Sequence, residues 1–421
     1  MTALRPGGKG VPPAGTLGGH AARQLLRLGE HVGLSPADTK RYARILVDAL
    51  GPVAPRPLAL PAPSRSFLSD DHTPVEFSVS CEPGAAPSLR VLIEPGAGEP
   101  DLAHNGRTGL RVLRDMGRRW GFTTERLDEL EDLFFPASPH GPLALWIALE
   151  LRPGGVPKVK VYLNPAASGP ERAAKTVRKA LKRLGHRQAF ASLPDSDRHL
   201  FFALDLGDWA EPRAKVYLAH DDLSATEAGA LCRMDGGPDP AEIEDFFRIA
   251  AGHDGASAPG GPVSGAHGVP AGKDGAGPRV VRRPVQTCHA FTDTGAARPS
   301  GFTLYVPVRD HAPHDGEALV RAATLLGRYG LDPAPVLRAP AALTERRPED
   351  GVGLVAYLGV AHQHGRPPRV TTYLSSEAYE VRPPAPGPVP APAPAARHAG
   401  SPAVAVLSPV PQQAVPQPAV P

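Results

Sequence analysis

Two hydrophobic periodicities alternate along the chain. One is helical, because apolar residues recur on a single face, and the first such stretch begins at Ser35-Pro36, an N-cap followed by a first-turn proline. The five apolar stripes are Tyr42, Ile45, Leu46 and Ala49; Leu110, Leu113, Met116 and Trp120; Val177, Ala180, Leu181 and Leu184; Ile243, Phe246, Phe247 and Ala250; and Leu319, Ala322, Ala323 and Leu326. Helices that are apolar on one side only need an apolar surface to cover.

The other periodicity is the alternation typical of strands. We predict strands at residues 75–80, 88–94, 145–151, 158–163, 199–205, 213–219, 302–308, 353–360 and 369–374. Many of them come in pairs joined by short turns rich in glycine, proline or polar residues. Antiparallel pairs that alternate with helices indicate an αββα unit repeated around a closed sheet, which makes the fold α+β. A barrel of this many strands is wide enough to hold a ligand.

Composition separates the flanking segments from this domain. Residues 251–280 contain nine glycines and four prolines, and residues 382–421 contain thirteen prolines and only two charged residues. We therefore predict one barrel domain over residues 17–380 with a mobile loop at about 251–280. On either side of it we predict a flexible N-terminus over residues 1–16 and a disordered proline-rich tail over residues 381–421.

Charge and cysteine usage exclude several classes of function. The net charge is only +3, from 46 basic and 43 acidic residues without a basic block, which argues against a nucleic-acid partner. No stretch reaches the ~18 to 20 apolar residues of a membrane span, and residues 1–16 lack the apolar core of a signal peptide. The three cysteines are scattered, and neither HExxH nor DDxxD occurs, so we expect a cytoplasmic protein without a metal site.

The predicted strands share an unusual polar face. Basic residues and a tyrosine alternate with valines and leucines, so that they point to one side. The sets are Lys158, Lys160 and Tyr162; Arg213, Lys215 and Tyr217; Thr303 and Tyr305; and Arg369, Thr371 and Tyr373. A solvent-facing polar side would explain any one of these strands. Four tyrosines in register, in a chain with only eight, favour a barrel lumen lined by lysine, arginine and tyrosine.

Such a lumen suits a particular kind of substrate. Several cations in a water-poor site attract a polyanion, and phosphate matches the geometry of both lysine and arginine. The faces of the tyrosine rings attract a cation, by roughly 0.5–2 kcal/mol each. A substrate that separates into an anion and a carbocation fits both halves, and an allylic diphosphate is one.

The same residues resemble the indole prenyltransferases of the dimethylallyltryptophan-synthase type. The resemblance covers about residues 20–380 and rests on motifs that recur in the order of the family. These are Thr73-Pro74-Val75-Glu76-Phe77-Ser78, Lys158-Val159-Lys160-Val161-Tyr162, Arg213-Ala214-Lys215-Val216-Tyr217 and Tyr305-Val306-Pro307. The run from Leu133 to Pro165 is most similar to bacterial tryptophan 6-dimethylallyltransferases. The family's fold is a ten-stranded antiparallel barrel ringed by helices.

The resemblance implies a role for each site residue. Diphosphate-binding cations would be Arg90, Lys160, Arg213, Lys215 and Arg369, and the shield around the allyl cation would be Tyr162, Tyr217, Tyr305 and Tyr373. Glu76 would accept a hydrogen bond from the indole N–H. Arg152 falls where fungal members carry a lysine near the indole ring, and Thr303 replaces a glutamine common in fungal members. Asn164 and Thr303 would line the substrate site.

The implied reaction transfers a dimethylallyl group from dimethylallyl diphosphate to the indole ring of L-tryptophan, at carbon 6. The built-in cations would replace a metal, so that no cofactor is expected. Two alternatives remain open at this point. One is the same fold acting on another aromatic acceptor, such as a cyclic dipeptide or a dihydroxynaphthalene. The other is a non-catalytic polyphosphate-binding barrel, which would have no use for Glu76 and four tyrosines.

Overall fold

The computed structural model describes residues 12–207, 209–253 and 283–384, which all belong to one compact unit. Most of the predicted flexible N-terminus, mobile loop and proline-rich tail lies outside these residues. At the C-terminal side the described chain continues past residue 380, and Arg382 forms an isolated bridge with Val352. None of the helices in the described ranges is long and apolar enough to cross a membrane.

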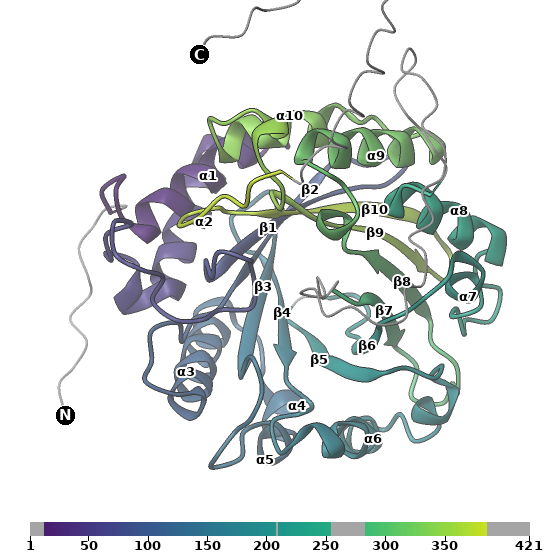
Figure 1. The fold of residues 1–421 in the computed structure, drawn as a ribbon. Coiled ribbons are helices and arrows are strands. Elements are labelled where there is room, and N and C mark those ends of the chain that lie inside the picture. Colours follow the sequence, from purple (N-terminus) through teal and green to yellow (C-terminus); the bar gives the residue numbers. More distant parts are fainter. Residues whose placement is uncertain (1–11, 208, 254–282, 385–421) are drawn as a thin grey trace, which may run out of the picture. The chain divides into compact units, whose positions relative to one another are not determined.

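Ten antiparallel strands close into a barrel (Figure 1). The strands are β1 (Val75–Cys81), β2 (Ser88–Ile93), β3 (Leu145–Leu151), β4 (Lys158–Leu163), β5 (Arg198–Leu206), β6 (Ala214–His220), β7 (Val285–Phe291), β8 (Gly301–Val306), β9 (Val355–Gln363) and β10 (Arg366–Ser375). Each strand pairs with the next along the chain, and β1 pairs with β10 to close the barrel. The predicted α+β barrel is confirmed.

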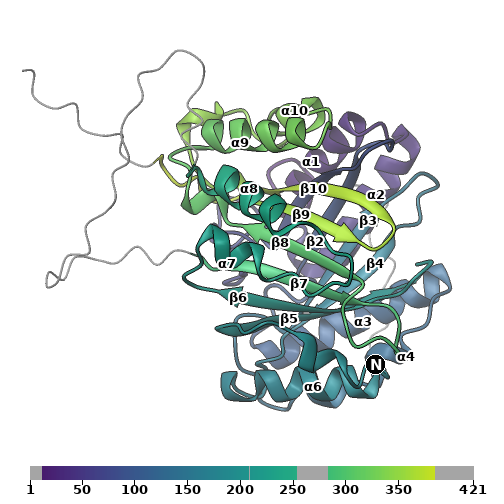
Figure 2. The same ribbon diagram turned by 90° about the vertical axis from the view of Figure 1, so that its right-hand side faces the viewer.

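Helices separate the strand pairs and lie outside the barrel (Figures 1 and 2). They are α1 (Leu17–His31), α2 (Pro36–Leu50), α3 (Leu102–Trp120), α4 (Glu125–Asp128), α5 (Glu131–Phe134), α6 (Ala173–Arg183), α7 (Ala225–Gly229), α8 (Pro240–Ala251), α9 (Asp315–Arg328) and α10 (Ala334–Leu343). The predicted cap of α2 is present, since the Ser35 hydroxyl accepts a hydrogen bond from the Asp38 N–H. Helix α1 has no predicted counterpart. Its Gly18 lies so close to Ala54 that a β-carbon there would come within 2.8 Å of the Ala54 side chain.

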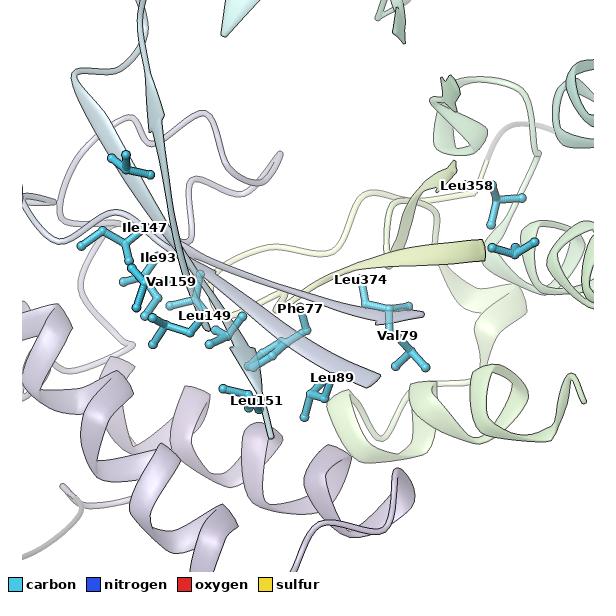
Figure 3. Close-up of a cluster of buried hydrophobic side chains, with 14 of the residues drawn as sticks. Phe77, Val79, Leu89, Ile93, Ile147, Leu149, Leu151, Val159, Leu358 and Leu374 are labelled. Carbon is cyan, nitrogen blue, oxygen red and sulfur yellow. The ribbon is translucent and has the colours of Figure 1, made fainter. Parts of the chain in front are cut away.

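The hydrophobic core lies between the outer face of the barrel and the helices. Figure 3 shows part of this layer, in which Phe77 and Val79 of β1 lie among leucines and isoleucines of neighbouring strands. Both side chains are 1% exposed. Because side chains alternate along a strand, burying this face outward directs Glu76 and Ser78 into the lumen. The polar faces of the strands therefore line the inside of the barrel.

Strand β7 has no counterpart among the nine predicted strands. Its outward positions include Thr287 and His289 between Val285 and Phe291, and its inward positions include Cys288. Neither face shows the clean apolar alternation by which strands are recognised in a sequence. Its pairing with β6 and β8 closes a gap that the hydrophobic pattern alone would leave in the barrel.

Candidate active site in the barrel lumen

The strand directions sort the luminal residues into two ends. In an antiparallel barrel every second strand runs the same way, so β4, β6 and β10 present their basic residues at one end and the following tyrosine further in. Odd-numbered strands run the opposite way. Glu76, near the start of β1, therefore lies toward the other end, whereas Asp205 and Glu150, near the ends of β5 and β3, lie at the basic end.

The basic end holds a set of buried and half-buried cations, here called the cation cluster: Arg90, Lys160, Arg213, Lys215 and Arg369. Lys160 and Lys215 are each 7% exposed. Arg213, Lys215 and Arg369 line one hollow together with Thr303. The sequence thus identified five residues from β2, β4, β6 and β10, with Arg213 directly before β6, that the fold brings to one place.

Two carboxylates lie among these cations, Asp205 buried and Glu150 half-buried. Asp205 accepts a hydrogen bond of 2.5 Å from Arg213 Nε, and its Oδ1 lies 3.8 Å from Lys160 Nζ. Glu150 accepts two hydrogen bonds from Arg90, at 2.7 and 3.0 Å. The register places both acids directly across from cations, as Lys160 pairs with Asp205 and Arg90 with Glu150. Five cations and two carboxylates leave an excess of positive charge.

The pKa values reflect this excess. Burial lowers the pKa of Lys160 well below its ordinary value, and repulsion from Lys215 lowers it further. Burial also lowers the pKa of Arg369, to about 10, with a further contribution from Arg90. Burial alone would raise the pKa of Asp205, but the surrounding cations outweigh it and hold the pKa below its ordinary value. The cluster therefore favours a bound anion, which would offset the mutual repulsion.

Trp209 covers part of the cation cluster. Its indole N–H donates to the carbonyl oxygens of Val159 and Leu206, both at 2.9 Å. Arg213 lies 5.0 Å and Lys160 Nζ lies 5.9 Å from the ring centre. The π-face of the ring attracts these two cations.

The four tyrosines form a continuous layer next to the cation cluster. Ring centres are 5.5 Å apart for Tyr162 and Tyr217, 6.0 Å for Tyr217 and Tyr305, and 5.7 Å for Tyr305 and Tyr373. Burial raises the pKa of all four, so that they stay neutral phenols at ordinary pH. All four also line the pocket on the other side of the layer. The layer thus lies between the cations and that pocket.

That pocket, here called the Glu76 pocket, is otherwise mostly apolar. Its further lining residues are Phe67, Leu68, Leu92, Trp146, Phe201, Gln286, Arg309 and Tyr357. Glu76 is 8% exposed, and burial raises the pKa of its carboxyl to about 8, although the charge of Arg309 acts to lower it. A flat aromatic ligand with one N–H donor matches an apolar slot that ends in a carboxyl.

Two predicted site residues lie elsewhere. Arg152 follows the end of β3, so it is at the basic end of the barrel rather than beside Glu76. Its side chain is 42% exposed, with Nε 3.6 Å from Glu150 Oε1. Asn164 is 2% exposed, but its amide donates to the carbonyls of His140 and Leu143 and accepts from the Ala166 N–H. These three bonds shape the turn after β4, and Asn164 lines neither hollow.

Other luminal residues have no role in the sequence-based prediction. The rings of Trp146 and Phe201 are tilted by 45° to each other with centres 5.3 Å apart, and the Tyr357 hydroxyl accepts a hydrogen bond of 3.1 Å from Gln286. Strand parity places Trp146 inward, opposite Tyr162, which is the signal that could have found it. Arg309 follows β8 in a short 3₁₀ turn, where no periodicity indicates direction. Within the described ranges, no three His, Cys, Asp or Glu side chains group as a metal site.

Comparison with known proteins agrees with this geometry. A family model described as tryptophan dimethylallyltransferase matches residues 22–334. The chain is similar to 5-dimethylallyltryptophan synthase from Streptomyces coelicolor, with 62% identity over 88% of this chain and 100% of that one, at a TM-score of 0.79. It is also similar to the prenyltransferase PriB, solved with L-tryptophan and dimethylallyl thiolodiphosphate, with 56% identity over 88% of this chain and 99% of that one, at a TM-score of 0.81.

A third solved structure is less similar in sequence. This is 6-dimethylallyltryptophan synthase from Micromonospora olivasterospora, with 38% identity over 88% of this chain and 99% of that one, at a TM-score of 0.76. The sequence motifs predicted the greatest similarity to 6-dimethylallyltransferases. The chain is instead less similar in sequence to this 6-dimethylallyltryptophan synthase than to the 5-dimethylallyltryptophan synthase. The family itself is confirmed by the matched model and by all three structures. The chain belongs to the tryptophan dimethylallyltransferase family.

Proposed function

We propose that this protein transfers a dimethylallyl group from dimethylallyl diphosphate to the indole ring of L-tryptophan. The observation that carries the proposal is the tyrosine layer between the cation cluster and the Glu76 pocket. An allylic diphosphate with its anion among the cations would place its allyl group against the tyrosines. An indole in the Glu76 pocket would face that group from the other side.

The cation cluster would bind the diphosphate and stabilise it as it leaves. Ionisation breaks the bond between the allyl carbon and the diphosphate oxygen, and the bonding electrons go to the oxygen. Lys160 and Lys215 are held by their strands and Arg213 by its hydrogen bond to Asp205 before the reaction, so that they need little reorganisation as charge develops. Trp209 restricts the access of water to this end of the lumen, which strengthens the attraction.

The tyrosine layer would protect the allyl cation. The faces of Tyr162, Tyr217, Tyr305 and Tyr373 attract positive charge, by roughly 0.5–2 kcal/mol each. Their rings also exclude water, which would otherwise trap the cation as an alcohol. Because their hydroxyls have raised pKa values, the tyrosines are poor nucleophiles toward the cation.

Glu76 would orient and activate the indole. Its carboxylate would accept a hydrogen bond from the indole N–H, which shifts electron density into the ring. A ring carbon then forms the new bond to the allyl carbon. The C–H bond of that carbon breaks, its electrons restore aromaticity, and the proton is released together with the diphosphate, so that the overall reaction balances. Trp146 and Phe201 would pack against the acceptor, as wide apolar surfaces do for a planar ligand.

The position of transfer is part of the proposal. The resemblance in the sequence predicts carbon 6. The identity of 62% to a 5-dimethylallyltryptophan synthase against 38% to a 6-dimethylallyltryptophan synthase favours carbon 5 instead. We propose carbon 5, and the product of the reaction distinguishes the two positions directly.

The test is an incubation of the purified protein with dimethylallyl diphosphate and L-tryptophan. We expect a product heavier than tryptophan by one dimethylallyl group in place of one hydrogen, with its ring position read by NMR. Parallel incubations contain a tryptophan cyclic dipeptide or a dihydroxynaphthalene as acceptor. If the protein turned over one of these acceptors faster than tryptophan, that acceptor would be the better candidate for the substrate. Binding of diphosphates without turnover of any acceptor would instead support a polyphosphate-binding barrel.

A further inference from the structure

Arg213 is held from three sides at the basic end of the barrel. Its Nε donates to Asp205 on β5 at 2.5 Å, and its Nη1 donates to Oε1 of Gln363, the last residue of β9, at 3.0 Å. The guanidinium also lies 5.0 Å from the centre of the Trp209 ring. Because Arg213 directly precedes β6, the position of its side chain depends on these three contacts.

The hydrogen bond between Arg213 and Gln363 crosses the basic end of the barrel. Two strands, β7 and β8, lie between β6 and β9. The residues that these two strands place beside the bond are small, since Ala290 pairs with Gly301 and Gly301 pairs with Gln363. All four residues line the hollow of the cation cluster. Two long side chains therefore meet across a space that β7 and β8 leave open.

The two ends of the Gln363 amide face groups of opposite charge. A guanidinium only donates hydrogen bonds, so the amide oxygen is the atom that faces Arg213. The amide nitrogen donates to Oε2 of Glu211 at 3.4 Å, and Glu211 is exposed in the turn between β5 and β6. The neutral amide therefore stands between the guanidinium and this carboxylate.

A neutral acceptor at this position preserves the charge that attracts a diphosphate. Asp205 and Glu150 already offset part of the charge of the cation cluster. A carboxylate in place of the Gln363 amide would bind the guanidinium at least as strongly, but it would cancel one further positive charge. An amide oxygen fixes the direction of the guanidinium and leaves the charge unchanged.

We propose that Gln363 is a positioning residue that holds the Arg213 guanidinium toward the diphosphate of the allylic donor without neutralising it. This inference rests on the proposed function, because it concerns the donor of that reaction. Within the described residues, Nε and Nη1 of Arg213 bind Asp205 and Gln363, which leaves the two N–H bonds of Nη2 for a phosphate oxygen.

The test measures the dissociation constants of inorganic diphosphate and of dimethylallyl thiolodiphosphate by calorimetry. In Gln363→Glu we expect both ligands to bind about 10- to 100-fold more weakly, because the new carboxylate neutralises Arg213. The affinity for tryptophan should stay within about threefold. A residue with a merely structural role would not produce this result, since the two side chains have nearly the same shape.

A charge-swap variant separates the position of the carboxylate from the total charge. Glu211→Gln combined with Gln363→Glu keeps the total charge and avoids two carboxylates side by side. This variant should melt close to the temperature of the unmodified protein, and it should still show the 10- to 100-fold loss of affinity for both diphosphates. Glu211→Gln alone is the matched control, and its affinity for both ligands should change by less than about threefold.

Gln363→Met removes the acceptor atom and keeps the length of the side chain. We expect the thiolodiphosphate to bind about 3- to 10-fold more weakly and kcat to fall by a similar factor, with the KM for tryptophan within about twofold. When Arg213→Ala is already present, Gln363→Met should cause no further loss. This double-mutant cycle isolates the contact between the two side chains.

Two results would overturn the inference and leave the proposed function intact. One is an affinity for diphosphate within about threefold of the unmodified protein in both Gln363→Glu and the charge-swap variant, which decides the question even if Gln363→Met does not fold. The other is the same loss from Gln363→Met with and without the Arg213 side chain. If the unmodified protein binds neither ligand, the proposed function fails, and the inference fails with it.

Discussion

The ionisation of Glu76 should control the dependence of the rate on pH. Burial in the Glu76 pocket raises the pKa of this carboxyl from 4.5 to about 8. That shift corresponds to a penalty of about 5 kcal/mol on the carboxylate form in the empty pocket. At pH 7 only about a tenth of the empty protein then carries the carboxylate that accepts the indole N–H. The fraction of the protein that carries this carboxylate falls about tenfold for each pH unit below 7.

Tryptophan should offset part of this penalty when it binds. A hydrogen bond from the indole N–H to the carboxylate is worth roughly 1.5–3 kcal/mol, which lowers the pKa of Glu76 by about one to two units. The complex should therefore titrate at about pH 6 to 7. The pH dependence of kcat/KM reports the pKa of Glu76 in the free protein, and that of kcat reports its pKa in the complex. The two pH profiles should therefore be displaced from each other by about one to two pH units.

The assay measures initial rates from pH 6 to 9 at saturating dimethylallyl diphosphate, with tryptophan varied. We expect kcat/KM to rise about tenfold per pH unit from pH 6 and to level off above about pH 8, and kcat to level off earlier. Glu76→Gln should abolish the rise in both profiles. At pH 9 its kcat/KM should lie about 10- to 100-fold below that of the unmodified protein.

Glu94→Gln is the matched control. Glu94 is also buried and its pKa is also raised by burial, but it accepts hydrogen bonds from Ser66 and Asn105 and lines neither hollow. This variant should retain the rise with pH. The reasoning is refuted if Glu76→Gln keeps the rise, or if the unmodified protein titrates near pH 4.5 as an exposed glutamate does.

Three further predictions concern the cation cluster. Lys215→Ala should weaken binding of dimethylallyl thiolodiphosphate by about 10- to 100-fold in calorimetry and leave tryptophan affinity within about threefold, whereas equal weakening of both would place Lys215 outside the diphosphate site. Asp205→Asn leaves Lys160 and Arg213 without their carboxylate, so the ligand-free protein should lose about 3–5 kcal/mol of stability in denaturant unfolding. Added diphosphate should stabilise Asp205→Asn by more than it stabilises the unmodified protein. A variant as stable as the unmodified protein would contradict the ion pairing. Activity should survive excess EDTA with at most a modest loss, because side-chain cations surround the diphosphate; complete loss that magnesium restores would contradict the site.

Strand alternation explains why so much of the barrel was predictable. Lys160 and Tyr162 lie on β4, and Lys215 and Tyr217 on β6, so their shared direction follows from the period of two alone. The equivalent direction of alternate strands then brings the basic residues to one end without further information. Strand β7 was not predicted because polar Thr287 and His289 occupy its outward face, where apolar residues are expected.

Residues beyond the strand ends could not be placed in this way. By strand alternation Arg152 would point inward like Glu150 of β3. At Arg152, however, the chain has already left the barrel for the turn after β3, and this turn lies at the end of the barrel away from Glu76. Arg309 and Leu68 reach the Glu76 pocket from segments outside the strands, whose paths depend on tertiary packing. Turn chemistry explains Asn164, whose amide bonds to the backbone rather than to a ligand.

The two acids among the cations were also unexpected. An anion site suggests positive residues only, and the sequence gives no reason to place Asp205 and Glu150 inside it. The register supplies that reason, since each acid lies directly across from a cation on the neighbouring strand. The pairing of neighbouring strands therefore shows which acid faces which cation in the ligand-free protein, and the sequence of a single strand does not show this.

The central claim is that the lumen is divided, with the diphosphate at one end, the acceptor at the other and the tyrosine layer between them. The structure of the protein with dimethylallyl thiolodiphosphate and L-tryptophan tests this claim most directly. We predict diphosphate oxygens within hydrogen-bond distance of Lys160, Arg213 and Lys215, and the indole N–H within hydrogen-bond distance of Glu76. Diphosphate bound at Arg309, or an indole bound among the cations of β4 and β6, would contradict the account.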